Sequence, residues 1–227
     1  MQRGPKAGVD PSPLPFKSSL KGAARFAAFC RRYIVTPKGH GVGKPMILRP
    51  WQVKLVGAIL DPPQRPRTAG IMMPRGQGKT SLMAALCVYT LFTGPEGTSV
   101  VVAAVDQRQA ELTFKTAARM VELNPELLAR CQVFRERLEI PAKGGTFVAL
   151  PAEAKRLEGL DYTLAILDEI GVIARDTYDG TFGTRQAPRV NGYRRRNTKR
   201  QWRFRPAGHA PVRARASRRL VVCLARI

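Results

Sequence analysis

The chain has 227 residues, of which 44% are hydrophobic, and this is enough for one well-packed domain with additional arms. No apolar run reaches about 18 residues, and the N-terminus lacks the apolar segment of a secretory signal, so we expect a cytoplasmic protein without a membrane span. The four cysteines have no CxxC spacing, which argues against a zinc site or a disulfide framework.

The net charge of +23 indicates a polyanionic partner such as nucleic acid. Residues 1–179 hold 25 Lys and Arg and all 16 Asp and Glu, giving +9, whereas residues 180–227 hold 14 Lys and Arg and no acid, giving +14. Two interpretations stay open: the protein binds nucleic acid, or its C-terminal segment alone raises the charge.

Residues 1–24 are predicted to form a flexible arm, because prolines recur at positions 5, 11, 13 and 15. A helix is expected next, with apolar side chains at helical spacing at Phe26, Phe29, Tyr33 and Ile34. The segment "WQVKLVGAIL" predicts a second helix that packs through Trp51, Leu55 and Ile59.

From Ala69 onward, short apolar runs alternate with amphipathic segments. The predicted strands are 70–73, which is expected to be buried, 98–105, a hairpin of 137–142 with 146–151, and 163–171; the predicted helices are 78–92 and 107–124. Strands that alternate with helices indicate an α/β fold with a mostly parallel sheet covered on both faces.

The stretch "IMMPRGQGKTS" has the parts of a phosphate-binding loop: a strand, a glycine-containing turn, a lysine and a hydroxyl at the start of a helix. Met73 stands where such a loop usually has its first glycine, and this requires an ordinary negative φ there. Lys79 is expected to contact the phosphates and the Thr80 hydroxyl to hold magnesium. The predicted nucleotide contacts are Pro74, Arg75, Gly76, Gln77, Gly78, Lys79, Thr80 and Ser81.

Two acids follow the last predicted strand in "TLAILDEI". Asp168 is placed to hold the magnesium of a bound nucleotide, and Glu169 to orient or polarise the attacking water. The competing interpretation is that the pair belongs to a solvated turn, but the upstream loop favours the catalytic one.

These motifs resemble the ATPase domain of the large terminase subunit of tailed phages, from about Phe26 to Tyr178. In that family an arginine often precedes the loop glycines, as in "PRGQGKT", and "LRPWQ" resembles the adenine-side motif, with Gln52 able to read the purine edge. The resemblance implies a P-loop ATPase of the additional-strand type that uses ATP and Mg²⁺. It also implies double-stranded DNA, the small terminase subunit, the portal and a homo-oligomeric ring as partners.

Arginines are candidates for sensing the γ-phosphate. Arg75 lies in the loop itself and is expected to act in cis, whereas Arg156 precedes the Asp168 strand and is expected to act on a neighbouring subunit. Arg130, Arg135 and Arg137 compete for the second role.

Family features are not recognised after about residue 180, where neither a strand ending in Ser/Thr-Thr nor the spaced carboxylates of a nuclease domain are found. We therefore expect an ATPase domain over 25–180, incomplete at its C-terminus, no nuclease activity, and a disordered or non-native tail over 181–227. A frameshift explains that tail; a basic arm that contacts nucleic acid is the alternative.

The function predicted from the sequence is an ATP-hydrolysing motor of DNA packaging. Two alternatives stay open: another P-loop DNA translocase or helicase, and an inactive prophage remnant that binds nucleotide or nucleic acid without turnover.

Overall fold

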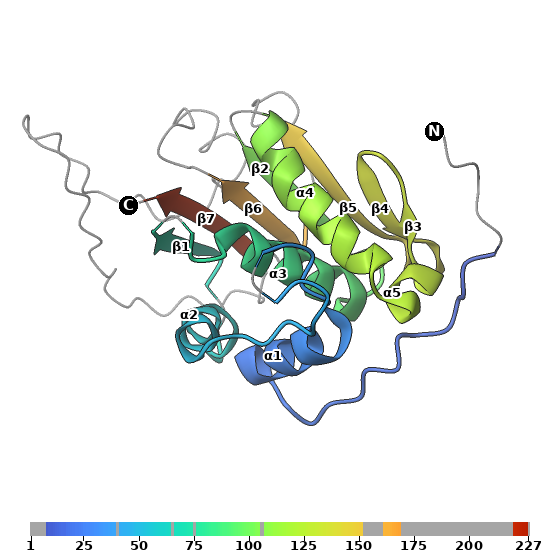
Figure 1. Ribbon diagram of the computed structural model, residues 1–227, viewed down its shortest axis with the longest axis horizontal. Helices are drawn as coiled ribbons and strands as arrows, with labels where there is room; N and C mark the ends of the chain where they lie inside the picture. The colour runs from blue at the N-terminus through green and yellow to red at the C-terminus, as the bar shows by residue number, and fades with distance from the viewer. Residues whose placement is uncertain are drawn as a thin grey trace, which may run out of the picture.

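One mixed sheet with helices packed on it forms the body of the molecule (Figure 1). The structure is a computed structural model, and it describes residues 8–39, 41–64, 66–74, 76–104, 107–151, 161–168 and 220–226. Within these residues no helix is both long and apolar enough to cross a bilayer.

The sheet has seven strands in the order β1-β7-β6-β2-β5-β4-β3. The first five strands in this order pair in parallel, whereas the pairings of β5 with β4 and of β4 with β3 are antiparallel, so that β4 alone runs against the other described strands. The predicted α/β fold with a mostly parallel sheet is therefore confirmed. The strands are β1 (Thr68–Met73), β2 (Ser99–Ala104), β3 (Gln132–Val133), β4 (Arg137–Ile140), β5 (Gly145–Pro151), β6 (Leu164–Asp168) and β7 (Leu220–Arg226).

The five described helices form two layers on one side of the sheet (Figure 1), and helical cover of its other face stays a prediction. In the inner layer, α3 (Lys79–Thr93) and α4 (Gln107–Glu122) pack against the strands, and α5 (Pro125–Arg130) adjoins α4. In the outer layer, α1 (Gly22–Tyr33) packs against α2 (Pro50–Leu60) and α3 through its predicted apolar residues, all of which are buried.

The central strands are buried on both faces, as their unbroken apolar sequences predict. All five residues of β6 are buried, and so are five of the six in β2. By contrast, Met72 in β1 is 52% exposed. The prediction of a fully buried strand is wrong here, because β1 is the edge strand of the described sheet and buries only one of its faces.

The strand β7 was not predicted. It lies between β1 and β6 and pairs in parallel with both. The expectation of a disordered or non-native tail over 181–227 is therefore wrong for Leu220–Arg226, which forms a strand of the sheet. The apolar run "LVVCLAR" predicts a strand despite the basic composition around it, because a strand inside a parallel sheet needs apolar side chains on both faces.

Two expectations for the N-terminal region also need correction. In α2 Ile59 is buried as predicted and Leu55 is partly buried against the core, but Trp51 is 37% exposed rather than packed, and Gln52 and Val56 are buried instead. The predicted arm ends at α1, which begins at Gly22, and its described part lies against the domain, with the ring of Phe16 edge-on to that of Phe29 at 5.4 Å between centroids.

Candidate nucleotide-binding site

The turn between β1 and α3 has the backbone of an anion-binding loop. Gly76 and Gly78 adopt φ angles of 78° and 77°, in the left-handed region that other L-residues rarely enter. Gly78 precedes α3 and supplies no side-chain cap, so the first N–H groups of the helix are left for another acceptor. Met73 is the buried last residue of β1, which fits the ordinary backbone expected where the usual first glycine is replaced.

Lys79 and Asp168 meet at this loop although they are 89 residues apart in the chain. Lys79 is the first residue of α3 and Asp168 the last of β6, and the Lys79 Nζ donates to the Asp168 Oδ1 at 2.6 Å. Their side chains are only 11% and 9% exposed. The structure thus brings together the lysine of the loop and the acid that the sequence assigns to magnesium.

Gln52 lies beside the same loop. A Cβ atom on Gly78 would be 3.8 Å from the Gln52 Nε2, so the amide group of this buried side chain faces the glycine turn. Its Oε1 accepts the backbone N–H of Arg49 at 2.9 Å and so caps the start of α2. The role in reading a purine edge stays a prediction, and the Nε2 donor is the part of the amide that this cap leaves available.

The remaining predicted contacts fall into two groups. Pro74, Gly76 and Gln77 are exposed in the turn, and Thr80 and Ser81 are partly buried in the first turn of α3. The catalytic candidates Arg75, Arg156 and Glu169 lie outside the described residues.

Two of the three arginines that compete with Arg156 already have partners. Arg130 pairs with Asp10 at 3.0 Å and donates to the Ser12 carbonyl at 2.9 Å. These two contacts hold the N-terminal arm against α5. Arg137 pairs with Glu139 at 2.6 Å. Arg135 is exposed. The contact of Arg130 with Asp10 was not predicted from the sequence. The signal that could have indicated it is that Asp10 is the single acid in the first 60 residues.

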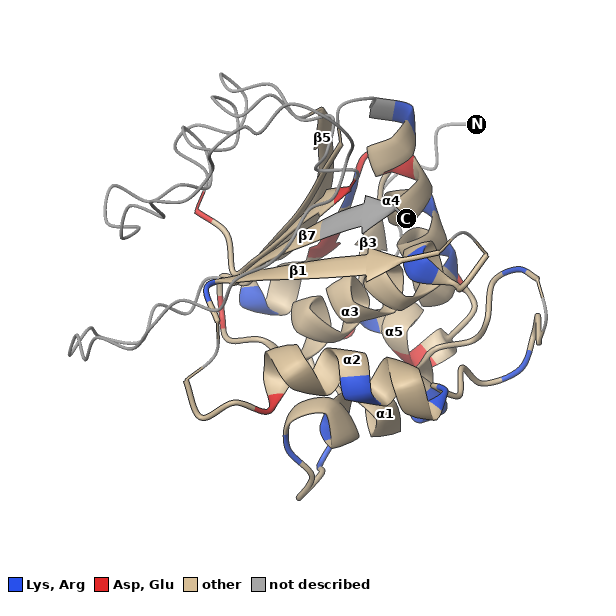
Figure 2. Ribbon diagram, turned by 90° about the vertical axis from the view of Figure 1, so that its left-hand side faces the viewer, with Lys and Arg blue, Asp and Glu red and all other residues tan. Residues whose placement is uncertain are grey.

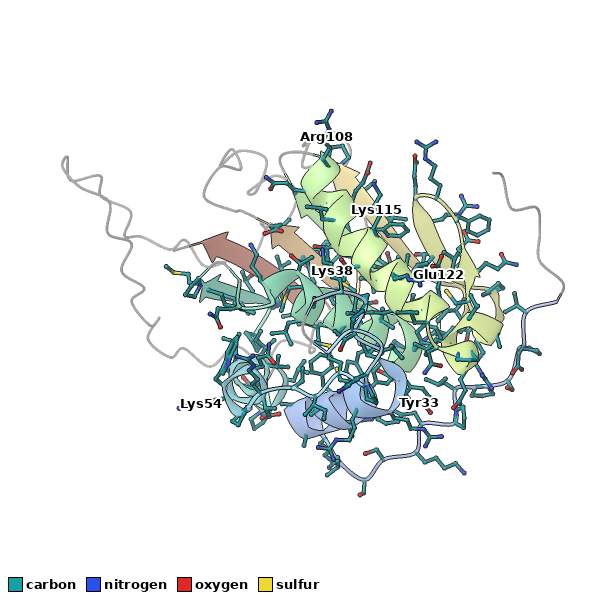
Figure 3. The ribbon with its side chains drawn as sticks, in the orientation of Figure 1. Tyr33, Lys38, Lys54, Arg108, Lys115 and Glu122 are labelled. Atoms are coloured by element: carbon teal, nitrogen blue, oxygen red, sulfur yellow. The ribbon has the colours of Figure 1, made fainter. Side chains whose placement is uncertain are left out.

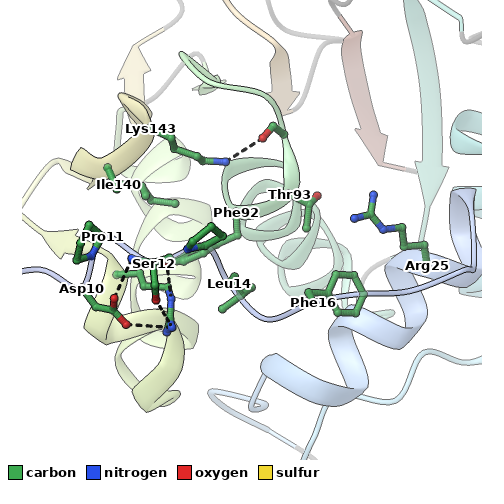
Figure 4. A pocket seen from close by; sticks show the side chains of 14 residues that line it. Asp10, Pro11, Ser12, Leu14, Phe16, Arg25, Phe92, Thr93, Ile140 and Lys143 are labelled. Carbon is green, nitrogen blue, oxygen red and sulfur yellow. Dashed lines mark hydrogen bonds and ion pairs between the residues drawn. The ribbon is translucent and has the colours of Figure 1, made fainter.

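A cavity of about 320 Å³ opens between the arm and the C-terminal end of α3, where Phe92 and Lys143 line it (Figure 4). The Lys143 Nζ donates to the Gly94 carbonyl at 3.1 Å, and burial lowers the pKa of this lysine to about 8. Because α3 has 15 residues and rises about 1.5 Å per residue, the cavity lies roughly 20 Å from Lys79 and is not part of the phosphate site.

A parallel sheet, a glycine turn leading into a helix, and a lysine paired with the acid at a strand end define a P-loop nucleotide-binding domain. Comparison with known proteins narrows this class. The family described as "Terminase large subunit, ATPase domain" matches residues 50–194, more than half of the chain, and the chain belongs to that family. The match continues past Tyr178, where the sequence resemblance was expected to end.

Two comparisons with the large terminase of phage HK97, one of sequence and one of structure, agree with this assignment. The chain is 35% identical over 161 residues to the large terminase subunit of Enterobacteria phage HK97, covering 66% of this chain and 30% of that protein. The crystal structure of the HK97 bacteriophage large terminase superposes with a TM-score of 0.68 at 25% identity, covering 91% of this chain and 38% of that one. The chain thus spans about a third of the length of the HK97 large terminase.

Proposed function

We propose that this chain is the ATP-hydrolysing part of a motor that moves double-stranded DNA into a phage capsid. The observation that carries the proposal is the buried pair of Lys79 with Asp168 beside the glycine turn. Family membership supports the motor role.

The residues present fit a magnesium ion bound together with a nucleotide. The carboxylate of Asp168 and the hydroxyl of Thr80 are hard oxygen donors, which Mg²⁺ prefers, and a set of one or two protein ligands is usual where phosphates supply others. When bound, the ion would neutralise charge on the β- and γ-phosphates. Asp168 would have to release Lys79 in order to serve as a ligand of the magnesium ion.

Each residue of the site then has a separate task. Lys79, freed from Asp168, neutralises the phosphates, and the N–H groups at the start of α3 donate hydrogen bonds to the phosphate oxygens. Glu169 orients the attacking water, and Arg75 and Arg156 sense the γ-phosphate in cis and in trans. Double-stranded DNA, the small terminase subunit, the portal and further copies of the chain are the proposed partners.

The test is ATP turnover by the purified protein, with and without duplex DNA. Glu169→Gln should bind ATP with unchanged affinity but hydrolyse it at least about 100-fold more slowly. Lys79→Ala should weaken binding by several kcal/mol, because it removes a charge-assisted contact in a preorganised site. Lys115→Ala is the control, since Lys115 is an exposed lysine of α4.

The outcomes separate the alternatives. Equal turnover by the wild type and Glu169→Gln would refute the assignment of the catalytic acid. Nucleotide binding without any turnover by the wild type would favour the inactive remnant.

A further inference from the structure

We propose that the exposed basic side chains of α1, α2 and the loop between them bind the phosphate backbone of duplex DNA. This surface, called the basic surface below, consists of Lys21 at the N-cap of α1 and of Arg31, Lys38, Lys44, Arg49 and Lys54; Arg32 of α1 is also exposed but lies over the ring of Tyr33. The inference rests on the proposed function for the identity of the polyanion, but the surface itself is defined by charge and exposure.

The positive charge outside the tail is concentrated in this part of the chain. Residues 1–60 hold 11 Lys and Arg and one acid, giving +10, whereas residues 61–179 hold 14 Lys and Arg and 15 acids, giving −1. The ATPase sheet and its inner helices are therefore close to neutral. Figure 2 shows the positive residues of α1, α2 and their connecting loop in blue. Such segregation on one layer is typical of a surface that meets phosphates.

Two acids near this layer are already engaged in the fold. Asp10 pairs with Arg130 of α5, and the Asp61 Oδ1 accepts the backbone N–H of Ala23 at 2.7 Å, where it serves as a cap for α1. Across the described part of the chain, no ion pair joins any side chain of the basic surface to a carboxylate. These cations therefore face solvent without local neutralisation, and Figure 3 shows Lys54 extending outward from α2.

The loop that carries Lys38 and Lys44 is a defined turn. Thr36 N–H donates to the Lys44 carbonyl at 2.9 Å, Lys44 N–H donates to the Gly41 carbonyl at 3.0 Å, and Val35 bridges Pro45 in antiparallel fashion. A backbone held in this way fixes the positions from which the two lysine side chains extend, so that less backbone entropy is lost on binding.

Duplex DNA fits this surface better than a single strand does. Proteins that bind single strands stack bases on exposed aromatic rings. Here Phe26, Phe29 and Tyr33 are fully buried, and Trp51 is the one large exposed aromatic among the described residues of this layer. Cations without a stacking platform contact phosphates, which makes the expected binding independent of sequence.

The surface also adjoins the nucleotide site. Helix α2 carries Lys54 on its exposed side and Gln52, which faces the glycine turn, on its buried side. Arg49 contributes its side chain to the basic surface and its N–H to Gln52. DNA bound there would lie one helix away from the phosphate loop.

The experiment measures binding of the full chain to a random-sequence duplex by fluorescence anisotropy at several salt concentrations. The triple variant Lys38→Gln, Lys44→Gln, Lys54→Gln removes three charges from the basic surface. The control variant Arg108→Gln, Lys115→Gln, Arg119→Gln removes three charges from α4. The tail, with its 14 Lys and Arg, is identical in all three proteins.

Each phosphate contact contributes about 0.9 to the slope of log K against log salt, so the basic-surface variant should lower that slope by roughly 2 to 3, while the control keeps it. Equal slopes for both variants would overturn the proposal. So would a basic-surface variant that loses binding to phosphatidylglycerol vesicles but keeps the DNA slope. ATP turnover without DNA, measured on the same proteins, tests the proposed function separately. If the chain shows no turnover but the two variants still differ in slope, the ATPase proposal fails and the DNA-binding surface stands.

Discussion

Breaking the pair of Lys79 with Asp168 should destabilise the nucleotide-free protein strongly. The Nζ and Oδ1 atoms are 2.6 Å apart, and both side chains are about nine-tenths buried. Removing one partner leaves the other charge buried without compensation, which typically costs 3–5 kcal/mol. Lys79→Met and Asp168→Leu should each lower the free energy of unfolding by about this amount.

The double variant should be more stable than the sum of the two single effects predicts. With both charges absent, no uncompensated charge remains, and apolar side chains of similar volume can replace a buried ion pair at little cost. The coupling energy between the two positions is therefore expected to be about 3 kcal/mol, measured by urea unfolding of the wild type, both single variants and the double variant.

Lys115 and Glu111 supply a matched control pair. Their atoms are 2.7 Å apart, close to the distance in the site, but the side chains are 67% and 33% exposed on α4. Exposed pairs at this helical spacing contribute about 0.3–0.5 kcal/mol. A coupling energy at the nucleotide site as small as that of this control would refute the argument that burial makes the pair strong.

Three further predictions concern other parts of the domain. Asp61→Ala should lower the free energy of unfolding, measured with urea, by about 1 kcal/mol, because the Asp61 carboxylate caps α1. Gly22→Ala should lower it further in the same assay, because Gly22 has a φ of 53° and the new Cβ would collide with the Asp61 Oδ1. Burial lowers the pKa of Lys143 from 10.5 to about 8, so between these pH values the unfolded chain binds more protons than the folded one. The free energy of unfolding of the wild type should therefore rise with pH across this window relative to that of Lys143→Met. Parallel plots of unfolding free energy against pH for the two proteins would contradict the assignment. Gly78→Ala should weaken nucleotide binding in a titration, whereas Gly97→Ala, at a similar φ of 70°, should introduce similar strain and leave affinity unchanged.

The sequence predicted most of the fold because its signals are local. Apolar runs at strand length and helical spacing identified β2, β6, α1, α3 and α4, and the "KGG" turn identified the hairpin of β4 with β5. The loop and Asp168 could be assigned to one site because the carboxyl ends of parallel strands share an edge of the sheet.

Other features depend on contacts that the sequence does not specify locally. Leu55 and Val56 are both apolar, so the buried face of α2 is decided by how the helix docks and not by periodicity. Trp51 is exposed for the same reason. The direct pairing of Lys79 with Asp168 also could not be predicted, since each residue was assigned to a different part of the ligand.

The position of β7 connects the two halves of the candidate site. The strands that lead to the phosphate loop and to Asp168 are not neighbours: β7 pairs with β1 in the register Met73 to Arg226 and with β6 in the register Leu167 to Cys223. Because neighbouring strands lie about 4.8 Å apart, one intervening strand places the ends of β1 and β6 at roughly twice that distance, a gap that the long side chain of Lys79 spans to reach Asp168. Residues from the basic segment beyond 180 thus determine the spacing of the loop and the acid, and the apolar character of β7 is a requirement of the site as much as of the core.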